Sequence, residues 1–314
     1  MKVILIEPPW SDVYGSYKAA ARVGVLYPPL GLCYLSSIGK KRGSEVEVID
    51  SEAEMLTTTQ VAERIIEKNP GVVGITSTTP IHHNASSIAE KIKKIIDIPI
   101  ILGGPHVTSL PAQAMEGCES FDYGVFGEGE HTFIELLDHL ESGDKDLSKI
   151  AGLIYRKEGE VIINKKRELI KDLDSLPYPS RDILKSGRYL WSIPHKGIVP
   201  FATIQTSRGC PFQCIFCSTG TVFGKKIRRR SIKNVVEEIQ SIVDEMEIRH
   251  FCFIDDTLTL DKEYVKSLCN EIEKQGLDIT WEGWTRADTV DHDILQTMKK
   301  AGFIRVSFAT ETGN

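Results

Sequence analysis

The 314-residue sequence lacks several features that would place it outside the ordinary globular class. No apolar run is long enough to span a bilayer, and the short apolar run at the N-terminus has no secretory cleavage pattern, so we interpret it as a first strand. An excess of positive charge is also absent: the formal net charge is −6, and nothing argues for a nucleic-acid surface. The seven cysteines are an odd number, and most are scattered. This usage fits a reducing cytoplasm better than a disulfide framework.

Apolar segments alternate with amphipathic segments over residues 1–142. Short apolar runs bounded by glycine or proline predict strands, and segments with helical spacing predict the helices between them. This alternation predicts an α/β fold with a flavodoxin-like, doubly wound parallel sheet, which binds its ligand at the carboxyl ends of the strands. The expected strands are 2–6, 45–50, 72–77, 98–104 and 121–127, and the expected helices are 30–43, 58–71, 85–97, 111–118 and 130–142.

The segment 143–200 interrupts this alternation. Residues 151–166 predict a β-hairpin around Glu-Gly, and residues 173–184 a proline-bearing connector. The alternation resumes over residues 201–314, which predicts the first part of a β/α barrel. Four strands are too few to close a barrel, so we expect a truncated barrel or an unusual open sheet. The expected strands are 201–207, 250–256, 279–286 and 304–310, and the expected helices are 232–246, 262–276 and 292–302.

Three cysteines are crowded into eight residues directly after the strand at 201–207. Cys210, Cys214 and Cys217 have the spacing C-x3-C-x2-C. Three thiolates are too few for a closed structural zinc site, and Cys252, in an apolar strand, is more simply a buried cysteine than a fourth ligand. A 4Fe-4S cluster held by three thiolates has one free iron, which is open to a substrate or cofactor. We expect metal ligands here, with a loop of unpaired or zinc-bound cysteines as the alternative.

The sequence CPFQCIFC (210–217), including the aromatic Phe216, resembles the signature of radical S-adenosylmethionine (SAM) enzymes. The preceding SRGC resembles the subgroup whose barrel follows a cobalamin-binding domain. The resemblance implies that each cysteine ligates one iron, that SAM chelates the fourth iron, and that an electron cleaves SAM to a 5′-deoxyadenosyl radical. It also implies that Asp255 and Asp256 lie near the methionine moiety and that Glu311 bonds the ribose hydroxyls. Helix-capping or solvated carboxylates are the alternative for these acids.

Residues 1–142 resemble the cobalamin-binding domain of this subgroup, through PPLGLCYLSSIGKKRG, VVGITSTTP, IILGGPHV and FDYGVFGEGE. A glycine pair removes side chains where a nucleotide base must approach the backbone. Hydroxyls after the third strand are candidates to bond the nucleotide tail, and the helix N-terminus after GEGE suits a phosphate. Tight turns are the alternative for each. The candidate cofactor-binding residues are Ser77, Thr79, Gly103, Gly104, Gly127 and Gly129.

A motif found in many cobalamin domains is missing. The loop after the first strand reads EPPWSDVYG, where D-x-H-x-x-G would supply a histidine ligand to cobalt. The cobalamin-dependent radical enzymes usually lack this motif too, so its absence agrees with the resemblance. His82, His83 and His106 lie on other loops. We assign none of them to cobalt, because a lone loop histidine is usually solvated or hydrogen-bonded.

The resemblance implies a cobalamin-dependent radical SAM enzyme that performs methyl transfer or cyclisation on an unactivated position of a small-molecule substrate. A flavodoxin or ferredoxin is the implied electron donor. Residues 1–142 would bind cobalamin, residues 143–200 would form a linker, and residues 201–314 would form the N-terminal part of a radical SAM barrel. We expect this barrel to be truncated, with its remaining strands and the substrate pocket lying beyond the fourth strand.

Two alternatives differ in cofactor or in activity. One is a radical SAM enzyme of the methylthiotransferase type, or of another type without cobalamin. Cys33 and Cys118 are too few for the second cluster that methylthiotransferases carry in their first domain. The other is a non-catalytic cobalamin-binding protein or a zinc module, against which the three clustered cysteines and the barrel strands argue.

Overall fold

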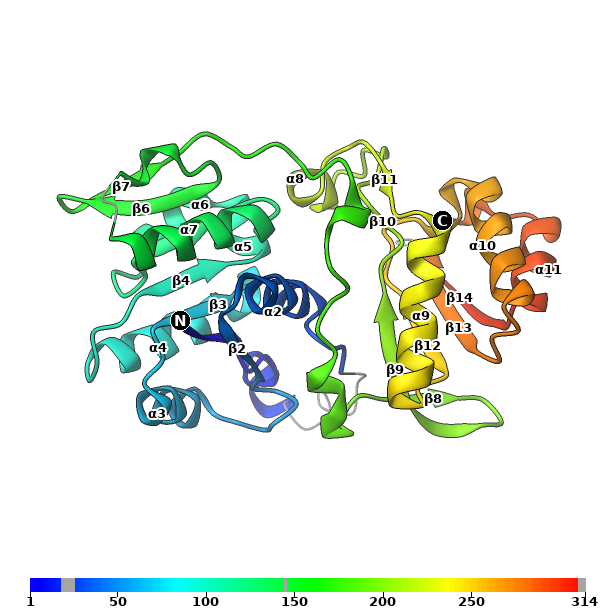
Figure 1. Ribbon diagram of the computed structural model, residues 1–314, viewed down its shortest axis with the longest axis horizontal. Coiled ribbons are helices and arrows are strands. Elements are labelled where there is room, and N and C mark those ends of the chain that lie inside the picture. Colours follow the sequence, from blue (N-terminus) through cyan, green and yellow to red (C-terminus); the bar gives the residue numbers. More distant parts are fainter. Residues whose placement is uncertain (18–25, 144–145, 310–314) are drawn as a thin grey trace. The chain divides into compact units, whose positions relative to one another are not determined.

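The computed structural model describes residues 1–17, 26–143 and 146–309. The chain divides into two compact units. The first comprises Met1–Ile170 and Pro177–Ile183, and the second comprises Lys171–Leu176 and Leu184–Asn314. In Figure 1 the first unit runs from blue to green and the second from green to red.

A seven-stranded sheet with the order β2-β1-β3-β4-β5-β6-β7 lies at the centre of the first unit. Strands β1 to β5 pair in parallel, and their order 2-1-3-4-5 is that of flavodoxin-like folds. The predicted doubly wound sheet is therefore confirmed. Its parallel strands are β1 (Lys2–Glu7), β2 (Glu45–Asp50), β3 (Val72–Thr76), β4 (Ile100–Gly103) and β5 (Tyr123–Val125).

Alternate side chains of these strands enter two different hydrophobic cores. Ile4 and Ile6 of β1 pack with the apolar residues of α3 and α4, while Val3 and Leu5 pack with those of α2 and α7. Because successive side chains of a strand point to opposite faces, a sheet covered on both sides needs apolar residues at every position. The helices are α2 (Leu30–Arg42), α3 (Thr58–Lys68), α4 (His82–Lys93), α5 (Pro105–Ser109), α6 (Pro111–Glu116) and α7 (Glu130–Ser142).

The predicted hairpin extends this sheet and makes it mixed. It consists of β6 (Leu153–Lys157) and β7 (Glu160–Ile163), and β6 pairs antiparallel with β5. Gly152, with φ of 79°, starts the hairpin where a Cβ would lie only 2.8 Å from Thr132 Oγ1. The all-parallel expectation thus holds for β1 to β5 and not for the edge, because the hairpin covers the backbone groups that β5 would otherwise expose.

A five-stranded sheet with the order β14-β13-β12-β9-β8 lies at the centre of the second unit. Strands β9, β12, β13 and β14 pair in parallel, as expected, while the unpredicted β8 pairs antiparallel with β9. The strands are β8 (Leu190–Ile193), β9 (Gly197–Ile204), β12 (His250–Phe253), β13 (Thr280–Thr285) and β14 (Phe303–Phe308). A separate pair, β10 (Ser207–Arg208) and β11 (Arg228–Arg229), follows β9 and precedes α9.

Helices cover one face of this curled sheet (Figure 1). They are α9 (Ile232–Met246), α10 (Lys262–Lys274) and α11 (His292–Lys300), and a short α8 (Thr219–Val222) lies in the cysteine segment. Phe251, Phe253 and Trp281 are fully buried, and Trp281 Nε1 donates a 2.8 Å hydrogen bond to the carbonyl of Ala301, directly after α11. The alternate residues of the same strands therefore point to the opposite, inner face of the sheet.

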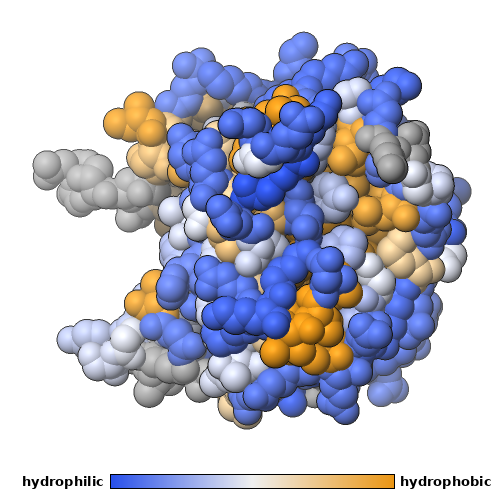
Figure 2. Space-filling view, turned by 90° about the vertical axis from the view of Figure 1, so that its left-hand side faces the viewer, coloured by the Kyte–Doolittle hydropathy of each residue, from blue (hydrophilic) through white to orange (hydrophobic). Residues whose placement is uncertain are grey.

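Within the ranges that the structure describes, no helix is long and apolar enough to cross a membrane. The surface seen in Figure 2 is largely hydrophilic, and its hydrophobic side chains lie in separate groups. Scattered exposed apolar residues of this kind are normal for a globular surface.

Candidate functional site

Loops at the carboxyl ends of β3, β4 and β5 meet at one edge of the first unit. The Ser77 N–H donates to the carbonyl of Gly103 at 3.0 Å, which joins the loop after β3 to the end of β4. The Gly127 N–H donates to Thr108 Oγ1 at 3.1 Å, which joins the loop after β5 to α5. Thr79 lies in the same loop as Ser77. The structure thus brings most of the predicted cofactor-binding residues of this unit to one edge.

The two adjacent glycines at this edge differ in what surrounds them. A Cβ on Gly103 would meet nothing within 4 Å, so this position opens onto free space. Gly104 has φ of 96°, and its Cβ would lie 2.6 Å from Thr76 Oγ1 and 2.8 Å from the backbone nitrogen of Ser77. Gly104 is therefore required by close packing against β3, while Gly103 leaves room for a flat group. Gly129 is the residue before α7, whose first N–H groups have no partner within the helix.

Two of the histidines that were assigned no role from the sequence, His82 and His106, also lie at this edge. Ser77 Oγ lies 3.3 Å from His82 Nδ1, and Thr79 Oγ1 lies 3.1 Å from His106 Nδ1. The two imidazole rings are 4.2 Å apart between centroids. Burial, together with the neighbouring His106, lowers the pKa of His82 to about 4, and burial also lowers the pKa of His106. Both rings are neutral at pH 7 and hold the hydroxyls that follow β3.

The loop after β1, which lacks the cobalt-ligating histidine, is held by hydrogen bonds from its backbone N–H groups to the side chain of Glu52. Glu52 Oε2 accepts from the N–H groups of Trp10 and Ser11, both at 2.9 Å. Glu7, the last residue of β1, is an acid that sequence reasoning missed. Burial, with a further contribution from the charge of Asp50, raises the pKa of Glu7 to about 8. Glu7 therefore carries its proton at neutral pH.

The cysteine segment of the second unit begins with a glycine that no other residue can replace. Gly209 has φ of 94°, and a Cβ there would lie 2.4 Å from the carbonyl oxygen of Lys226. The next residue, Cys210, donates its backbone N–H to the carbonyl of Gly224 at 3.3 Å. The two close approaches place Cys210 against the chain that leads into β11, at the carboxyl end of β9.

One thiol contacts the loop after β12 directly, and a second is linked to that loop through Thr219 of α8. Cys210 Sγ lies 3.5 Å from Thr257 Oγ1. Cys217 Sγ lies 3.3 Å from Thr219 Oγ1, which in turn donates to Asp256 Oδ1 at 2.8 Å. Asp256, a predicted site residue, is thereby linked to the cysteine segment through one hydroxyl. Burial raises the pKa of its carboxyl.

The third thiol contacts the loop after β13. Arg286 donates from its Nη1 to Cys214 Sγ at 3.7 Å, and its guanidinium lies 3.9 Å from the ring centroid of Phe212. Sequence reasoning missed Arg286, although its place at the carboxyl end of the predicted strand 279–286 was a usable signal. The apolar Ile215 and Phe216 are exposed, Phe216 to 66%. The cysteine segment and Arg286 together therefore present thiols, one positive charge and apolar side chains.

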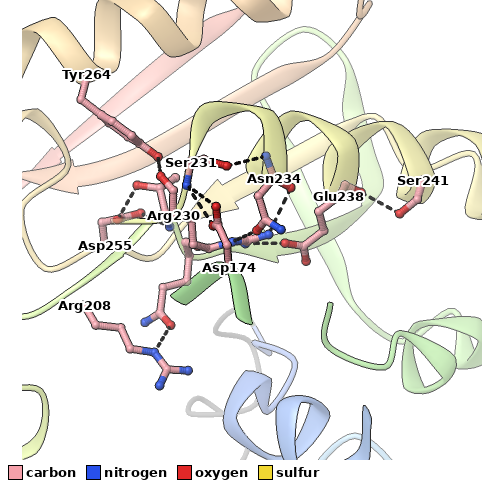
Figure 3. Close-up of polar contacts among 11 residues, drawn as sticks. Asp174, Arg208, Arg230, Ser231, Asn234, Glu238, Ser241, Asp255 and Tyr264 are labelled. Carbon is pink, nitrogen blue, oxygen red and sulfur yellow. Dashed lines mark hydrogen bonds and ion pairs between the residues drawn. The ribbon is translucent and has the colours of Figure 1, made fainter. Parts of the chain in front are cut away.

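Asp255 holds the chain in front of the cysteines (Figure 3). Its carboxylate accepts from the Thr206 N–H at 3.1 Å, from Thr206 Oγ1 at 2.7 Å and from Ser207 Oγ at 2.5 Å. Burial raises its pKa, and these hydrogen bonds oppose the rise. Both oxygens are occupied, so Asp255 positions β10 ahead of Cys210. Glu311, the predicted ribose contact, lies outside the described residues.

The two regions match two separate family models. Residues 18–137 match the B12-binding domain, and residues 204–314 match the radical SAM superfamily. Over its whole length the chain is 38% identical to an uncharacterised methyltransferase of Pyrococcus horikoshii. The chain belongs to the cobalamin-dependent radical SAM family. The expected resemblance is confirmed, and the family's cofactors are cobalamin, SAM and a 4Fe-4S cluster.

Other members of the family are similar over nearly all of this chain. An anaerobic magnesium-protoporphyrin IX monomethyl ester cyclase of Rubrivivax gelatinosus is 30% identical over 99% of the chain. The radical SAM methyltransferase TsrM of Kitasatospora setae, solved with cobalamin and a [4Fe-4S] cluster, superimposes with a TM-score of 0.77 at 19% identity, over 98% of this chain and 58% of TsrM. The chain spans 66% of the length of the Pyrococcus protein and 55% of that of the cyclase.

Proposed function

We propose that this chain is the cofactor-binding part of a cobalamin-dependent radical SAM enzyme that transfers a methyl group to a small-molecule substrate. The observation that carries the proposal is the set of three thiols at the carboxyl ends of parallel strands, with the loops after β12 and β13 against them. Cyclisation is the second candidate reaction, favoured by the similarity to the magnesium-protoporphyrin ester cyclase.

The residues of the cysteine segment fit a 4Fe-4S cluster. Cys210, Cys214 and Cys217 would each ligate one iron, and each sulfur already lies against a hydroxyl or a guanidinium. The Thr257 hydroxyl beside Cys210 and the Arg286 guanidinium beside Cys214 are donors that suit the negatively charged sulfur atoms of a cluster. When bound, the cluster supplies the electron that cleaves SAM, and cobalamin supplies the carrier for a methyl group. Phe216, Asp256 and, through its hold on β10, Asp255 would shape the SAM site beside it, together with Glu311.

The edge of the first unit fits the nucleotide tail of cobalamin. Gly103 opens onto space that a flat base can occupy, and Gly104 keeps the backbone close to β3. Ser77 and Thr79 would bond the tail through hydroxyls that the neutral His82 and His106 hold in place. Gly127 and Gly129 precede the N-terminus of α7, where free N–H groups would receive the phosphate.

These sites assign a different role to each of three parts of the chain. We assign cobalamin to residues 1–142, a connecting role to residues 143–200, and SAM and the cluster to residues 201–314. A flavodoxin or ferredoxin would deliver the electron. All seven cysteines are free, which suits a reducing compartment such as the cytoplasm.

Iron analysis after anaerobic reconstitution tests the cluster assignment. The wild-type chain should bind about four irons and about four sulfides, as one 4Fe-4S cluster requires. Cys214→Ala should lose most of this iron and the broad charge-transfer absorption. Cys269→Ala, which removes a buried cysteine of α10 outside the cysteine segment, should keep both. Full iron content in Cys214→Ala, or bound zinc in place of iron in the wild type, contradicts the assignment.

Cobalamin retention on gel filtration tests the other assignment. Gly103→Trp should fill the open space and abolish retention, because nothing within 4 Å opposes the new side chain. Glu119→Trp adds the same side chain to an exposed residue ahead of β5, at the opposite edge of the sheet, and should bind as the wild type does. Equal retention by both variants would place the nucleotide tail elsewhere.

A further inference from the structure

A buried group of three potential metal ligands lies in the second unit, away from the cysteine segment. His250, Cys252 and Glu282 each offer one ligand atom, and these atoms all lie within 4.8 Å of one another. Cys252 Sγ is 3.8 Å from Glu282 Oε1, and His250 Nε2 is 3.9 Å from Glu282 Oε2. The three residues are between 0% and 2% exposed. Titratable side chains are rarely buried to this degree without a partner that accounts for them.

Strand register brings the three residues together. His250 and Cys252 are two residues apart on β12, so they point to the same face, and Cys252 pairs directly with Glu282 of β13. The intervening Phe251 and Trp281 point the other way, into the helix-covered core. The ligand group therefore lies on the inner face of the curled sheet, whereas the cysteine segment follows the ends of its strands.

Neighbouring side chains fix the orientation of two of the three ligands. Trp191 Nε1 and Arg305 Nε donate to Glu282 Oε2 at 3.0 Å and 2.8 Å. These two bonds hold one carboxylate oxygen and leave Oε1 directed at the thiol. On the imidazole, Nδ1 lies 3.0 Å from Thr280 Oγ1. Such hydrogen bonds to the outer atoms of histidine and carboxylate ligands are the usual support of a metal site.

One polar atom in this group lacks any hydrogen bond. Among the described residues, His250 Nε2 is buried and has no hydrogen-bond partner. The carboxylate oxygen at 3.9 Å is too far to be one. The ion pair with Arg305 accounts for the Glu282 carboxylate, and the Cys252 thiol can donate to Glu282 Oε1 at 3.8 Å, but neither contact accounts for the buried His250 Nε2. A cation bound between the three atoms accounts for all of them.

We propose that His250 Nε2, Cys252 Sγ and Glu282 Oε1 bind a zinc ion. Nitrogen, sulfur and oxygen donors together match the ligand preference of zinc. In a tetrahedral zinc site, ligand atoms about 2.0 to 2.3 Å from the metal lie about 3.3 to 3.8 Å from one another. Here Cys252 Sγ lies 3.8 Å from Glu282 Oε1, and the three ligand atoms all lie within 4.8 Å of one another. Three protein ligands leave the fourth position open. Binding replaces the thiol proton of Cys252 by the metal and releases that proton to water.

The test removes the competing metal site first. In a chain carrying Cys210→Ser, Cys214→Ser and Cys217→Ser, zinc bound after dialysis should be about one per chain, as measured by elemental analysis. Replacement by cobalt(II) should give the intense absorption of a tetrahedral thiolate–cobalt site. This experiment leaves the inner group unaltered, so it does not depend on any variant of that group folding. An absence of bound zinc and of the cobalt–thiolate absorption overturns the proposal.

Variants in the same background locate the metal. Cys252→Ser should abolish the cobalt–thiolate absorption, and Glu282→Gln, which keeps the shape of the side chain, should weaken zinc binding at least tenfold. Cys269→Ser removes another fully buried cysteine, in α10, and should leave both measurements unchanged. Circular dichroism checks the fold of each variant. Retention of the absorption by a folded Cys252→Ser chain, or its loss in Cys269→Ser, shows that zinc is bound elsewhere and overturns the proposal.

Discussion

The two units place their functional groups at the same position of a similar scaffold but build them from different atoms. In the first unit, the edge of the sheet is shaped by backbone: glycines, loop amides and carbonyls, with hydroxyls held by histidines. In the second unit, Cys210 and Cys214 contact side chains from two other loops, and Cys217 contacts Thr219 of its own segment. A site shaped by backbone depends on steric space at single residues. A site made of side chains depends on the hydrogen bonds and ion pairs that hold the chain segments carrying those side chains.

The largest expected loss of stability comes from breaking a buried ion pair in the second unit. Arg230 Nη1 and Glu238 Oε2 are 2.5 Å apart, with side chains 5% and 2% exposed, and the pair holds the chain between β11 and α9 (Figure 3). Glu238→Ala leaves the guanidinium buried without its carboxylate and should lower the free energy of unfolding by about 3 to 5 kcal/mol. Chemical denaturation monitored by circular dichroism measures this change.

The control for this prediction lies in the first unit. Glu54 pairs with Arg64 at a similar distance, but both side chains are about a third exposed. Glu54→Ala should change the stability by no more than about 1 kcal/mol, because solvent screens the pair. If the two variants lose equal stability, the network around Arg230 is not what supports the second unit.

A smaller effect should distinguish the two adjacent glycines of the first unit. Gly104→Ala forces a Cβ to within 2.6 Å of Thr76 Oγ1 at a positive φ and should destabilise the fold by about 1 to 3 kcal/mol. Gly103→Ala meets open space and should stay within about 0.5 kcal/mol of the wild type. Thermal unfolding of both variants measures the difference. Equal melting temperatures would mean that packing does not explain the glycine pair.

Arg286 should affect the reduction potential of a cluster bound at the cysteine segment. Its guanidinium lies against Cys214 Sγ and Phe212. Arg286→Met removes a positive charge beside the proposed cluster, so the reduction potential of the reconstituted cluster should become more negative. Arg286→Lys keeps the charge and should shift the potential less. A redox titration followed by absorption measures both, and an unchanged potential in Arg286→Met would show that the guanidinium does not face the cluster.

A pH dependence of stability is also expected in the first unit. Burial lowers the pKa of His82 to about 4, whereas the unfolded chain has the ordinary value of 6.5. Between about pH 6.5 and pH 4 the His82 imidazole is protonated in the unfolded state but stays neutral in the folded state. The free energy of unfolding is therefore highest above pH 6.5 and decreases as the pH falls toward 4. His82→Gln should flatten the stability profile over this range. Denaturation midpoints from pH 7 to pH 4 measure it, and parallel profiles would contradict the lowered pKa.

Much of the fold followed from local patterns, and the departures have identifiable causes. Helix α2 is followed by Gly43, which has φ of 99°, where the predicted helix 30–43 ends, and α9 covers the predicted range 232–246. Strand β8 was missed because its pairing with β9 depends on a turn at residues 194–196 that no apolar pattern marks. The spacing of the three cysteines was sufficient to select them. Arg286 was not selected, because it is 72 residues from the Cys214 thiol that it contacts.

The order and type of the elements, the two domain families and the cysteine segment could be predicted from the sequence, because each is encoded in residues close together along the chain. Only the tertiary structure decided which strand ends meet, which adjacent glycine opens onto space, and that Cys252 pairs with Glu282 beside His250. A period of two residues predicts which side chains share a face of one strand. It does not predict the register between strands, which is set by packing of the whole sheet. The proposed zinc site depends on that register.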